Sequence, residues 1–332
     1  MGFFVPHAVD GGEPLNMGRF LNSRGSACDE GQVLVANTAL KAVENTIFER
    51  PYPPLKSAQL IFRKMDAGAW ATSTAYHQMD GSAKMVAIGG LAGDLPEASA
   101  GMDEKVQPVR EFGTAYGFGR KELIHAAKMG IPLDSLKARM CMRAYEELLD
   151  KLAAHGDLSL GIKGLLTLGL PRDSIATGID SGSTNASILA MLNDVASRVP
   201  DRTNEAARPN VLVLPIKQRD YLANTPYNTG GDARSILQVF LQNNEYITEV
   251  VAWTQLKAAG KTGVGTGGND HVMAVMRYDE MCLRQQIPEP FTPLEPQMHG
   301  TRTVVNCVAS IGGVECPYPE ENQIIDFPNN DE

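Results

Sequence analysis

The clearest hydrophobic period in this chain lies between residues 133 and 152. Apolar residues recur there at steps of three and four: Leu133, Leu136, Met140, Ala144, Leu148 and Leu152. This spacing places them on one stripe of a helix. Pro132 and Asp134 favour a helix start, and Gly156 favours its end. The pattern predicts a helix of about 22 residues, roughly 33 Å long, with a shorter helix before it at residues 120–129.

Alternating positions indicate β-structure between residues 68 and 115. One face of the first strand holds aromatic and threonine side chains: Trp70, Thr72, Thr74 and Tyr76. Asp80-Gly81 is a turn signal, and residues 106–116 are predicted as the returning strand. A two-stranded ribbon with half-apolar faces is marginal in water, so it needs a surface to pack on. The pattern leaves open whether this chain or a neighbouring one supplies that surface.

Helices and strands alternate from residue 180 onward, which predicts a second lobe of α/β type. Thr184 is the expected cap of a helix with one apolar face: Ile188, Met191, Leu192, Val195 and Val199. Two short helices are predicted after it, one from Pro215 and one from an Asp232 cap. Strands are predicted at residues 210–214, 247–256, 271–277, 303–311 and 313–316. The alternation favours two mixed lobes, one of them made from residues distant in sequence.

Composition limits the class of protein. The 332 residues are 43% hydrophobic and 21% charged, which is ordinary for a soluble globular chain. No run of about 18 apolar residues is present, so no membrane-spanning helix is predicted. The net charge of −9 argues against binding of phosphate backbones as the main activity. The scattered cysteines indicate reduced thiols: Cys28, Cys141, Cys282, Cys307 and Cys316.

Candidate chemistry is sparse. Gly260-Lys261-Thr262 resembles the end of a phosphate-binding loop, but Gln255 stands where that motif needs glycine, and a strand follows where it needs a helix. A nucleotide-binding enzyme that uses Gly260, Lys261 and Thr262 is therefore a distant alternative. The histidines have no partner at metal-ligand spacing, and no serine, histidine and acid combine into a catalytic set. We predict no enzyme, and no catalytic, cofactor or metal site.

A succession of short motifs gives a family resemblance. In chain order the motifs are Tyr76 with Gly81 and Ala83, Asp94-Leu95-Pro96, Tyr116-Gly117-Phe118, Leu133 to Ala138, His155-Gly156-Asp157, Gly161 with Gly164-Leu165-Leu166, Leu212 with Leu214-Pro215, Asn244 with Tyr246-Ile247, and Cys307-Val308-Ala309 with Gly312-Gly313-Val314. In this order the chain resembles the major capsid proteins of tailed bacteriophages that have the Hong Kong 97-type fold. The order establishes the resemblance, because no single motif is specific.

The resemblance implies an α+β fold with a defined division of the chain. The implied parts are an N-terminal arm at 1–50, a connection at 51–67, an extended β loop at 66–115, a peripheral domain at 116–179 plus 286–332 with a spine helix at 134–155, and an axial domain at 180–285. In such proteins the arm and the loop lie on neighbouring subunits. The implied inter-subunit contacts of the loop are Trp70, Tyr76, Leu91, Leu95, Pro96 and Glu97. The loop tip at 94–97 has no lysine, so no covalent crosslink is predicted.

The function that the resemblance implies is structural. Copies of the chain would self-assemble as pentamers and hexamers into an icosahedral shell that encloses phage double-stranded DNA without sequence-specific binding. The implied partners are other copies and scaffolding, portal and decoration proteins, with no membrane. The implied location is the virion, assembled in the host cytoplasm. An encapsulin-like shell, which encloses cargo enzymes, is the alternative that stays open.

Overall fold

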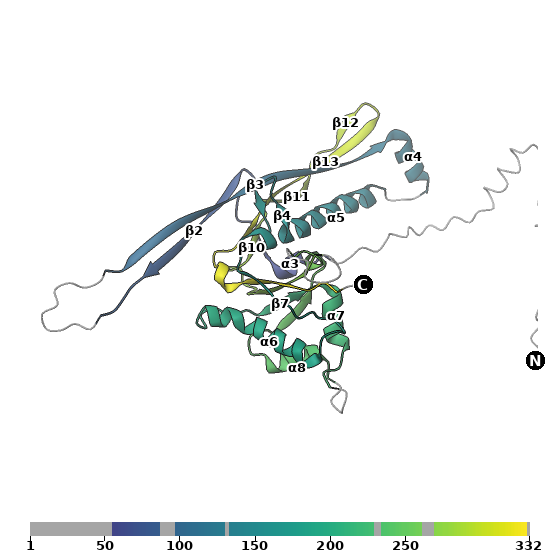
Figure 1. Cartoon of the computed structure of the whole chain (residues 1–332). Helices are drawn as coiled ribbons and strands as arrows, with labels where there is room; N and C mark the ends of the chain where they lie inside the picture. Colours follow the sequence, from purple (N-terminus) through teal and green to yellow (C-terminus); the bar gives the residue numbers. More distant parts are fainter. Residues whose placement is uncertain (1–54, 87–96, 130–132, 229–233, 261–268, 331–332) are drawn as a thin grey trace, which may run out of the picture. The chain divides into compact units, whose positions relative to one another are not determined.

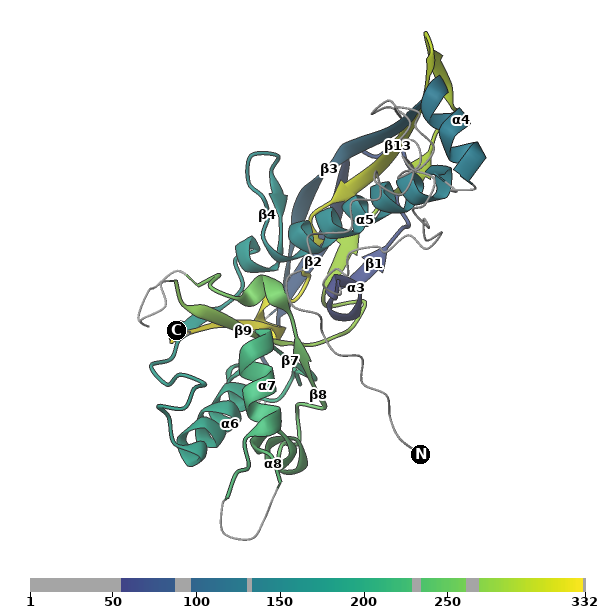
Figure 2. The same cartoon turned by 90° about the vertical axis from the view of Figure 1, so that its right-hand side faces the viewer.

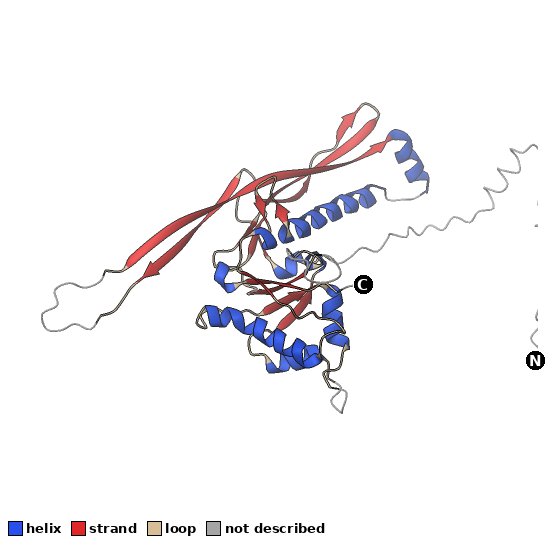
Figure 3. Cartoon of the chain, viewed as in Figure 1, coloured by secondary structure: helices blue, strands red, loops and turns tan. Residues whose placement is uncertain are grey.

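The computed structural model describes residues 55–86, 97–129, 133–228, 234–260 and 269–330 (Figure 1). The expected arm at 1–50 and the expected Asp232 cap lie outside these residues. The described residues mix helices and strands, as the resemblance implies (Figure 3). Their strands form two five-stranded sheets, one three-stranded sheet and one two-stranded sheet.

The first five-stranded sheet is built around one long strand, β3. Its antiparallel strands follow the order β11 (Glu289–Pro293), β13 (Arg302–Gly312), β3 (Ser99–Gly119) and β2 (Ser73–Ser82), with β12 (Gln297–His299) beside β13. Residues 99–108 of β3 pair with β2, and residues 109–119 pair with β13. We call β2 and the first half of β3 the ribbon, because these two strands continue out of the sheet as a pair (Figure 1).

The predicted turn at Asp80-Gly81 is wrong. β2 runs through both residues, with Asp80 opposite Gly101 and Gly81 opposite Ala100. Gly81 is not among the glycines with positive φ, which a two-residue hairpin turn needs at this kind of position. The physical reason is that the first half of β3 supplies ladder partners as far as Ser82, so the chain gains more by continuing the strand than by turning.

Helices α4 (Arg120–Met129) and α5 (Leu133–Ala154) end within one residue of their predicted bounds. Helix α5 lies along β3 and β13 in both views (Figures 1 and 2). Gly156 follows α5 with a φ of +69°, and a Cβ at this position would lie 2.4 Å from the Gly164 nitrogen. Both the backbone conformation and the close approach therefore require glycine where the helix was predicted to end.

The buried face of α5 differs from the predicted apolar stripe. Its core contacts come from Tyr145, Leu149 and Leu152. Of the predicted stripe, Met140 is 57% exposed and Leu148 is only half-buried. Leu152 is common to both faces, but along the preceding turns the buried residues Cys141, Tyr145 and Leu149 each follow a predicted position by one residue, about 100° around the helix. The reason is that an amphipathic residue, Tyr145, supplies part of the buried face, which a count of hydrophobic residues does not favour.

The second five-stranded sheet packs against three helices. Its order is β6 (Arg172–Ser174), β15 (Gln323–Phe327), β9 (His271–Met276), β7 (Val211–Leu214) and β8 (Glu249–Ala252). The helices are α6 (Asn185–Arg202), α7 (Ile216–Asn224) and α8 (Ile236–Asn243) (Figure 2). The predicted cap and apolar face of α6 are confirmed, because the Thr184 side chain accepts from the Ser187 amide at 3.3 Å and the predicted residues are buried. Ser235 caps α8, in a reciprocal arrangement with Gln238.

Two strands of this sheet come from outside the range 180–285. β15 pairs with β9, and β6 pairs with β15, although both strands lie in ranges expected for the peripheral domain. The expected boundaries at 179 and 286 therefore do not coincide with the boundaries of this sheet. All five residues of β15 are buried. Strands covered on both faces lose the alternating pattern, so β15 gave no signal in the sequence.

A three-stranded sheet lies between the two larger ones in the core. Its strands are β1 (Phe62–Lys64), β10 (Arg284–Gln286) and β14 (Val314–Glu315). One hydrophobic cluster joins Leu60, Leu283 and Val314 to Val213 and Ala274 of the second five-stranded sheet. The short elements are α3 (Ser57–Leu60), β4 (Gly156–Asp157), β5 (Ile162–Lys163) and 3₁₀ turns at Leu165–Thr167, Thr254–Leu256 and Pro319–Glu321.

Candidate functional site

One face of the ribbon carries exposed apolar side chains. Residues directly opposite each other in an antiparallel pair point to the same face, and successive residues alternate. Ala75 lies opposite Val106, and Met79 lies opposite Met102, so these four residues share a face, which we call the apolar face. Met79, Met102 and Val106 are 69%, 62% and 58% exposed. Only the pair His77 and Glu104 interrupts this surface.

The exposure of this face has a physical consequence. A two-stranded ribbon is marginally stable in water unless a further surface covers it. Neighbouring apolar side chains that stay exposed in a folded chain mark sites of interaction with other molecules. Methionine is flexible and polarizable, so it adapts to irregular partner surfaces. The apolar face of the ribbon is therefore the candidate functional site.

The opposite face of the ribbon is polar, and near its base it contacts the rest of the chain. Thr74 and Tyr76 are half-buried there. The Tyr76 hydroxyl donates to the Cys316 carbonyl oxygen at 3.3 Å. Burial raises the pKa of Tyr76 above its usual value of 10.0. The phenol therefore stays neutral and keeps its proton for this hydrogen bond.

The predicted contact residues fall into three groups. Trp70 is 87% exposed just before β2, and Glu97 is exposed just before β3. Tyr76 contacts its own chain, as described above. The other three lie outside the described residues: Leu91, Leu95 and Pro96.

Sequence reasoning missed Met79, Met102 and Val106. Met102 and Val106 are separated by three charged residues, so only their even spacing could have placed them on one face of a strand. The predicted turn at Asp80-Gly81 hid this spacing, because such a turn would leave residues 99–105 without a partner strand. The register of the ribbon places Met79 directly opposite Met102.

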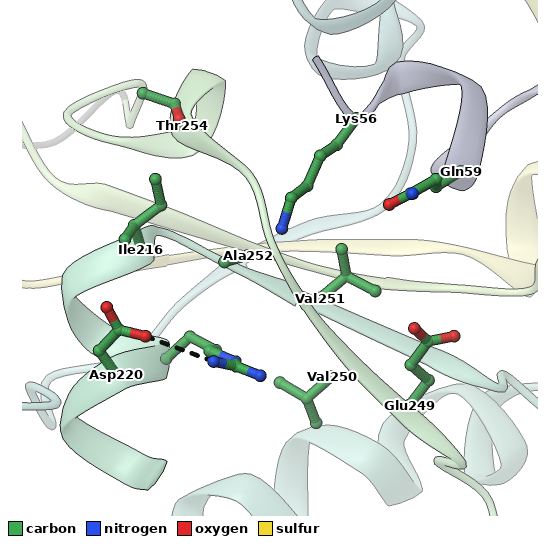
Figure 4. A pocket seen from close by; sticks show the side chains of 10 residues that line it. Lys56, Gln59, Ile216, Asp220, Glu249, Val250, Val251, Ala252 and Thr254 are labelled. Carbon is green, nitrogen blue, oxygen red and sulfur yellow. Dashed lines mark hydrogen bonds and ion pairs between the residues drawn. The ribbon is translucent and has the colours of Figure 1, made fainter. Parts of the chain in front are cut away.

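A hollow of about 370 Å³ lies beside β8, the edge strand of the second five-stranded sheet (Figure 4). It is lined by Lys56, Gln59, Ile216, Arg219, Asp220, Glu249, Val250, Val251, Ala252 and Thr254. Arg219 and Asp220 form an ion pair of 3.4 Å in its wall. No histidine, cysteine or serine is among these ten residues.

The phosphate-loop candidate lies mostly outside the described residues, which end at Gly260 and resume at 269. The Gly260 amide donates to the Asp270 carbonyl oxygen at 2.8 Å, and strand β9 then begins at His271. The first element described after this segment is therefore a strand, whereas a phosphate-binding loop is followed by a helix. Within the described ranges, no group of three histidine, cysteine or acidic residues could hold a metal ion. No helix there is long and apolar enough to span a membrane.

Comparison with known protein families gives a match over most of the chain. The family described as major capsid protein matches residues 81–326. Comparison with curated proteins gives no significant match.

Several solved structures have a similar fold. The capsid of Myoviridae phage XM1 superposes with a TM-score of 0.74 at 15% identity, covering 91% of this chain and 99% of that chain. The capsid of a native GTA particle gives a TM-score of 0.63 at 13% identity, with coverage of 90% and 98%. A structure from Mycobacterium phage Bobi gives 0.60 at 13% identity, with coverage of 91% and 100%. At these identities the likeness establishes the fold.

Proposed function

The chain belongs to the major capsid protein family, and on this premise we propose that it assembles as pentamers and hexamers into the icosahedral shell of a tailed phage. Its fold is the Hong Kong 97-type fold that the sequence motifs suggested. The encapsulin-like and nucleotide-binding alternatives are not favoured by the family match. In the proposed particle the shell encloses double-stranded DNA, and assembly takes place in the host cytoplasm.

The observation that supports this proposal best is the uncovered apolar face of the ribbon. We assign the ribbon the role of the extended loop, which lies on a neighbouring subunit. Covering Met79, Met102 and Val106 would contribute about 1.5–3 kcal/mol for each side chain that becomes fully buried. A shell has many identical copies of this contact, so a modest energy per copy is enough to hold it closed.

The other expected contacts of the ribbon region belong to the same proposal. Trp70 and Glu97 are exposed at the two ends of the paired strands, where a neighbour could reach them. Leu91, Leu95 and Pro96 lie between them in the sequence and are proposed as contacts of the loop tip. Tyr76 is proposed to support the contact indirectly, because its hydroxyl is bound to its own chain.

The charge of the chain suits a wall that does not bind its contents tightly. Its net charge is −9, so its average interaction with a phosphate backbone is repulsive. We propose that DNA is confined by the shell without sequence-specific binding. Scaffolding, portal and decoration proteins are the further partners that such a shell would need.

The test is a charge placed on the apolar face. Met102→Asp should leave the subunit folded, because the side chain is exposed, and should prevent formation of closed shells, because the neighbour would have to bury a carboxylate. The matched control is Ser82→Asp, which adds the same carboxylate on the opposite face of β2. Circular dichroism checks folding, and electron microscopy with sedimentation checks assembly. Shells of normal yield from Met102→Asp would contradict the proposal.

A further inference from the structure

Glu315 is a buried carboxylate at the place where the ribbon joins the rest of the chain. The residue is 1% exposed. One carboxylate oxygen, Oε2, accepts from Arg284 Nε at 2.8 Å and from Gln286 Nε2 at 2.9 Å, both on β10. The other oxygen, Oε1, accepts from Thr74 Oγ1 of β2 at 2.8 Å. A single side chain therefore ties the ribbon to the three-stranded sheet.

Tyr76 makes a second connection on the same face of β2. Its hydroxyl donates to the Cys316 carbonyl oxygen, the residue after Glu315. The Arg284 guanidinium carbon lies 5.8 Å from the centre of the Tyr76 ring, within the range of a cation–π interaction. Arg284 thus contacts both the buried carboxylate and the aromatic ring. We call Glu315, Arg284, Thr74 and Tyr76 the clamp.

The ribbon needs such a connection because β3 changes partners at its base. Ser73 and Pro108 form the first pair of the ribbon, and Val109 already pairs with Gly312 of β13. The Val109 amide also donates to the Thr72 carbonyl oxygen at 2.9 Å. Farther along β2, within the described residues, the side chains that form hydrogen bonds outside the ribbon are those of Thr74 and Tyr76.

The chemistry of the clamp favours one fixed geometry. Hydrogen bonds to an ionised carboxylate are stronger than neutral ones, and a low dielectric strengthens them further. The three donors to Glu315 come from two different strands, β2 and β10, so they restrict the angle between the ribbon and the three-stranded sheet. If the ribbon rotated at its base, Thr74 would move away and the buried carboxylate would lose a donor, which is unfavourable.

We infer that Glu315 is a positioning residue that fixes the direction in which the ribbon leaves the body of the subunit. The clamp then holds Met79 and Met102 where a neighbouring subunit can cover them. This inference rests on the proposed function of the ribbon as an inter-subunit contact. It goes beyond that proposal by naming the residues that set the orientation of the contact before assembly.

The test measures ribbon orientation by the distance between two spin labels in the unassembled subunit. The labels are placed at two exposed positions, Asp103→Cys on the ribbon and Glu147→Cys on α5. The background is Cys28→Ser, because the other four cysteines are buried. With the clamp intact we expect one narrow distance distribution. Thr74→Val keeps the shape of the side chain but removes its hydrogen bond to Glu315.

We expect Thr74→Val to widen the distance distribution about twofold or more, because further ribbon orientations become populated. Thr74→Ser keeps the hydroxyl and should restore the narrow distribution. Thr72→Val is the matched control, since its side chain is exposed, and should stay narrow. The thermal midpoint should be similar in all variants, which separates loss of orientation from loss of folding. A Thr74→Val distribution as narrow as that of Thr72→Val would overturn the inference.

Different measurements test the proposed inter-subunit contact and the inferred role of the clamp, so either can be contradicted without the other. The spin-label distance is measured before assembly, so it reports on the clamp whether or not the ribbon touches a neighbour. Normal shells from Met102→Asp would overturn the role of the apolar face and leave the distance result intact. Glu315→Gln is a second variant, which keeps the size but has a single acceptor oxygen for three donors. It should widen the distribution as Thr74→Val does, and a narrow distribution would contradict the role of the carboxylate.

Discussion

At the scale of single residues, Asp150 of α5 shows how one buried carboxylate connects distant segments. It is 3% exposed and accepts from the Ser57 amide at 3.0 Å, from Trp253 Nε1 at 3.1 Å and from Gln255 Nε2 at 3.0 Å. The partners lie 93, 103 and 105 residues away along the chain. The sequence could not predict this role, because an acid in a helix is usually on the solvated side.

We predict that Asp150→Ala lowers the free energy of unfolding by about 2–4 kcal/mol, because it leaves buried N–H donors without an acceptor. Glu147→Ala is the matched control on the same helix. Its carboxylate is exposed and paired with Arg143, so we expect a loss below about 1 kcal/mol. Urea unfolding followed by tryptophan fluorescence measures both variants. Equal effects from the two substitutions would show that the Asp150 contacts contribute little.

His155, at the end of α5, gives a prediction about pH. Burial lowers the pKa of His155 below its usual value of 6.5, and the charge of Lys151 acts in the same direction. The hydrogen bond with Gln255 and the charge of Asp150 act in the opposite direction, but burial is the larger effect. The unfolded chain therefore binds a proton at a higher pH than the folded chain does.

Stability from the neutral His155 is present above pH 6.5 and is lost as the pH falls from 6.5 through the lower folded pKa. The free energy of unfolding should therefore fall between a pH above 6.5 and a pH below it. We predict that this fall is smaller in His155→Asn than in the unaltered chain. His125→Asn, at an exposed position, is the control. Urea unfolding at the two pH values measures the difference. A drop equal to that of the unaltered chain would contradict the prediction.

At the scale of elements, the sequence predicted where helices lie better than which side they bury. The bounds of α4 and α5 follow from proline, aspartate and glycine at their ends, which are local signals. The buried side of α5 depends on the strands that face it, so a count of apolar residues placed Leu152 correctly but missed Tyr145 and Leu149. The turn predicted at Asp80-Gly81 was wrong for a similar reason, because the partner strand decides whether the chain turns at these residues.

The corrected face of α5 can be tested by two truncations. Leu149 is fully buried, so Leu149→Ala should cost about 2–5 kcal/mol of unfolding free energy. Met140 belongs to the sequence-predicted stripe but is mostly exposed, so Met140→Ala should cost less than about 0.5 kcal/mol. Denaturant titration of the two variants decides between the faces. A larger loss of unfolding free energy for Met140→Ala than for Leu149→Ala would support the stripe predicted from the sequence.

At the scale of the whole molecule, strands from distant parts of the chain complete both five-stranded sheets. β15, near the end of the chain, lies between β6 and β9, and β3 continues from the ribbon into a sheet completed by β13. A short strand such as β15 has weak periodicity, and partners that are far apart in the sequence, such as β3 and β13, do not follow from local pattern. The order of motifs predicted the family and the fold, whereas the sheet boundaries and the apolar face of the ribbon required the structure.

The arrangement at the ribbon base allows a deletion that separates folding from assembly. The Val109 amide donates to the Thr72 carbonyl oxygen, so the two residues are adjacent and an Asn-Gly pair can join them after removal of Ser73–Pro108. We predict that this shortened chain folds, because residues 109–119 of β3 keep their pairing with β13 and the contacts of α5 stay intact. Circular dichroism and cooperative urea unfolding check that expectation.

The shortened chain should not form closed shells, because the apolar face that is proposed to cover a neighbour is missing. Mixed with the unaltered chain, it should lower the yield of shells in proportion to its fraction, since its intact body still occupies a place among the subunits. Electron microscopy and sedimentation of such mixtures measure the effect. Closed shells from the shortened chain alone would mean that the remaining surfaces are sufficient, and that the ribbon has another purpose.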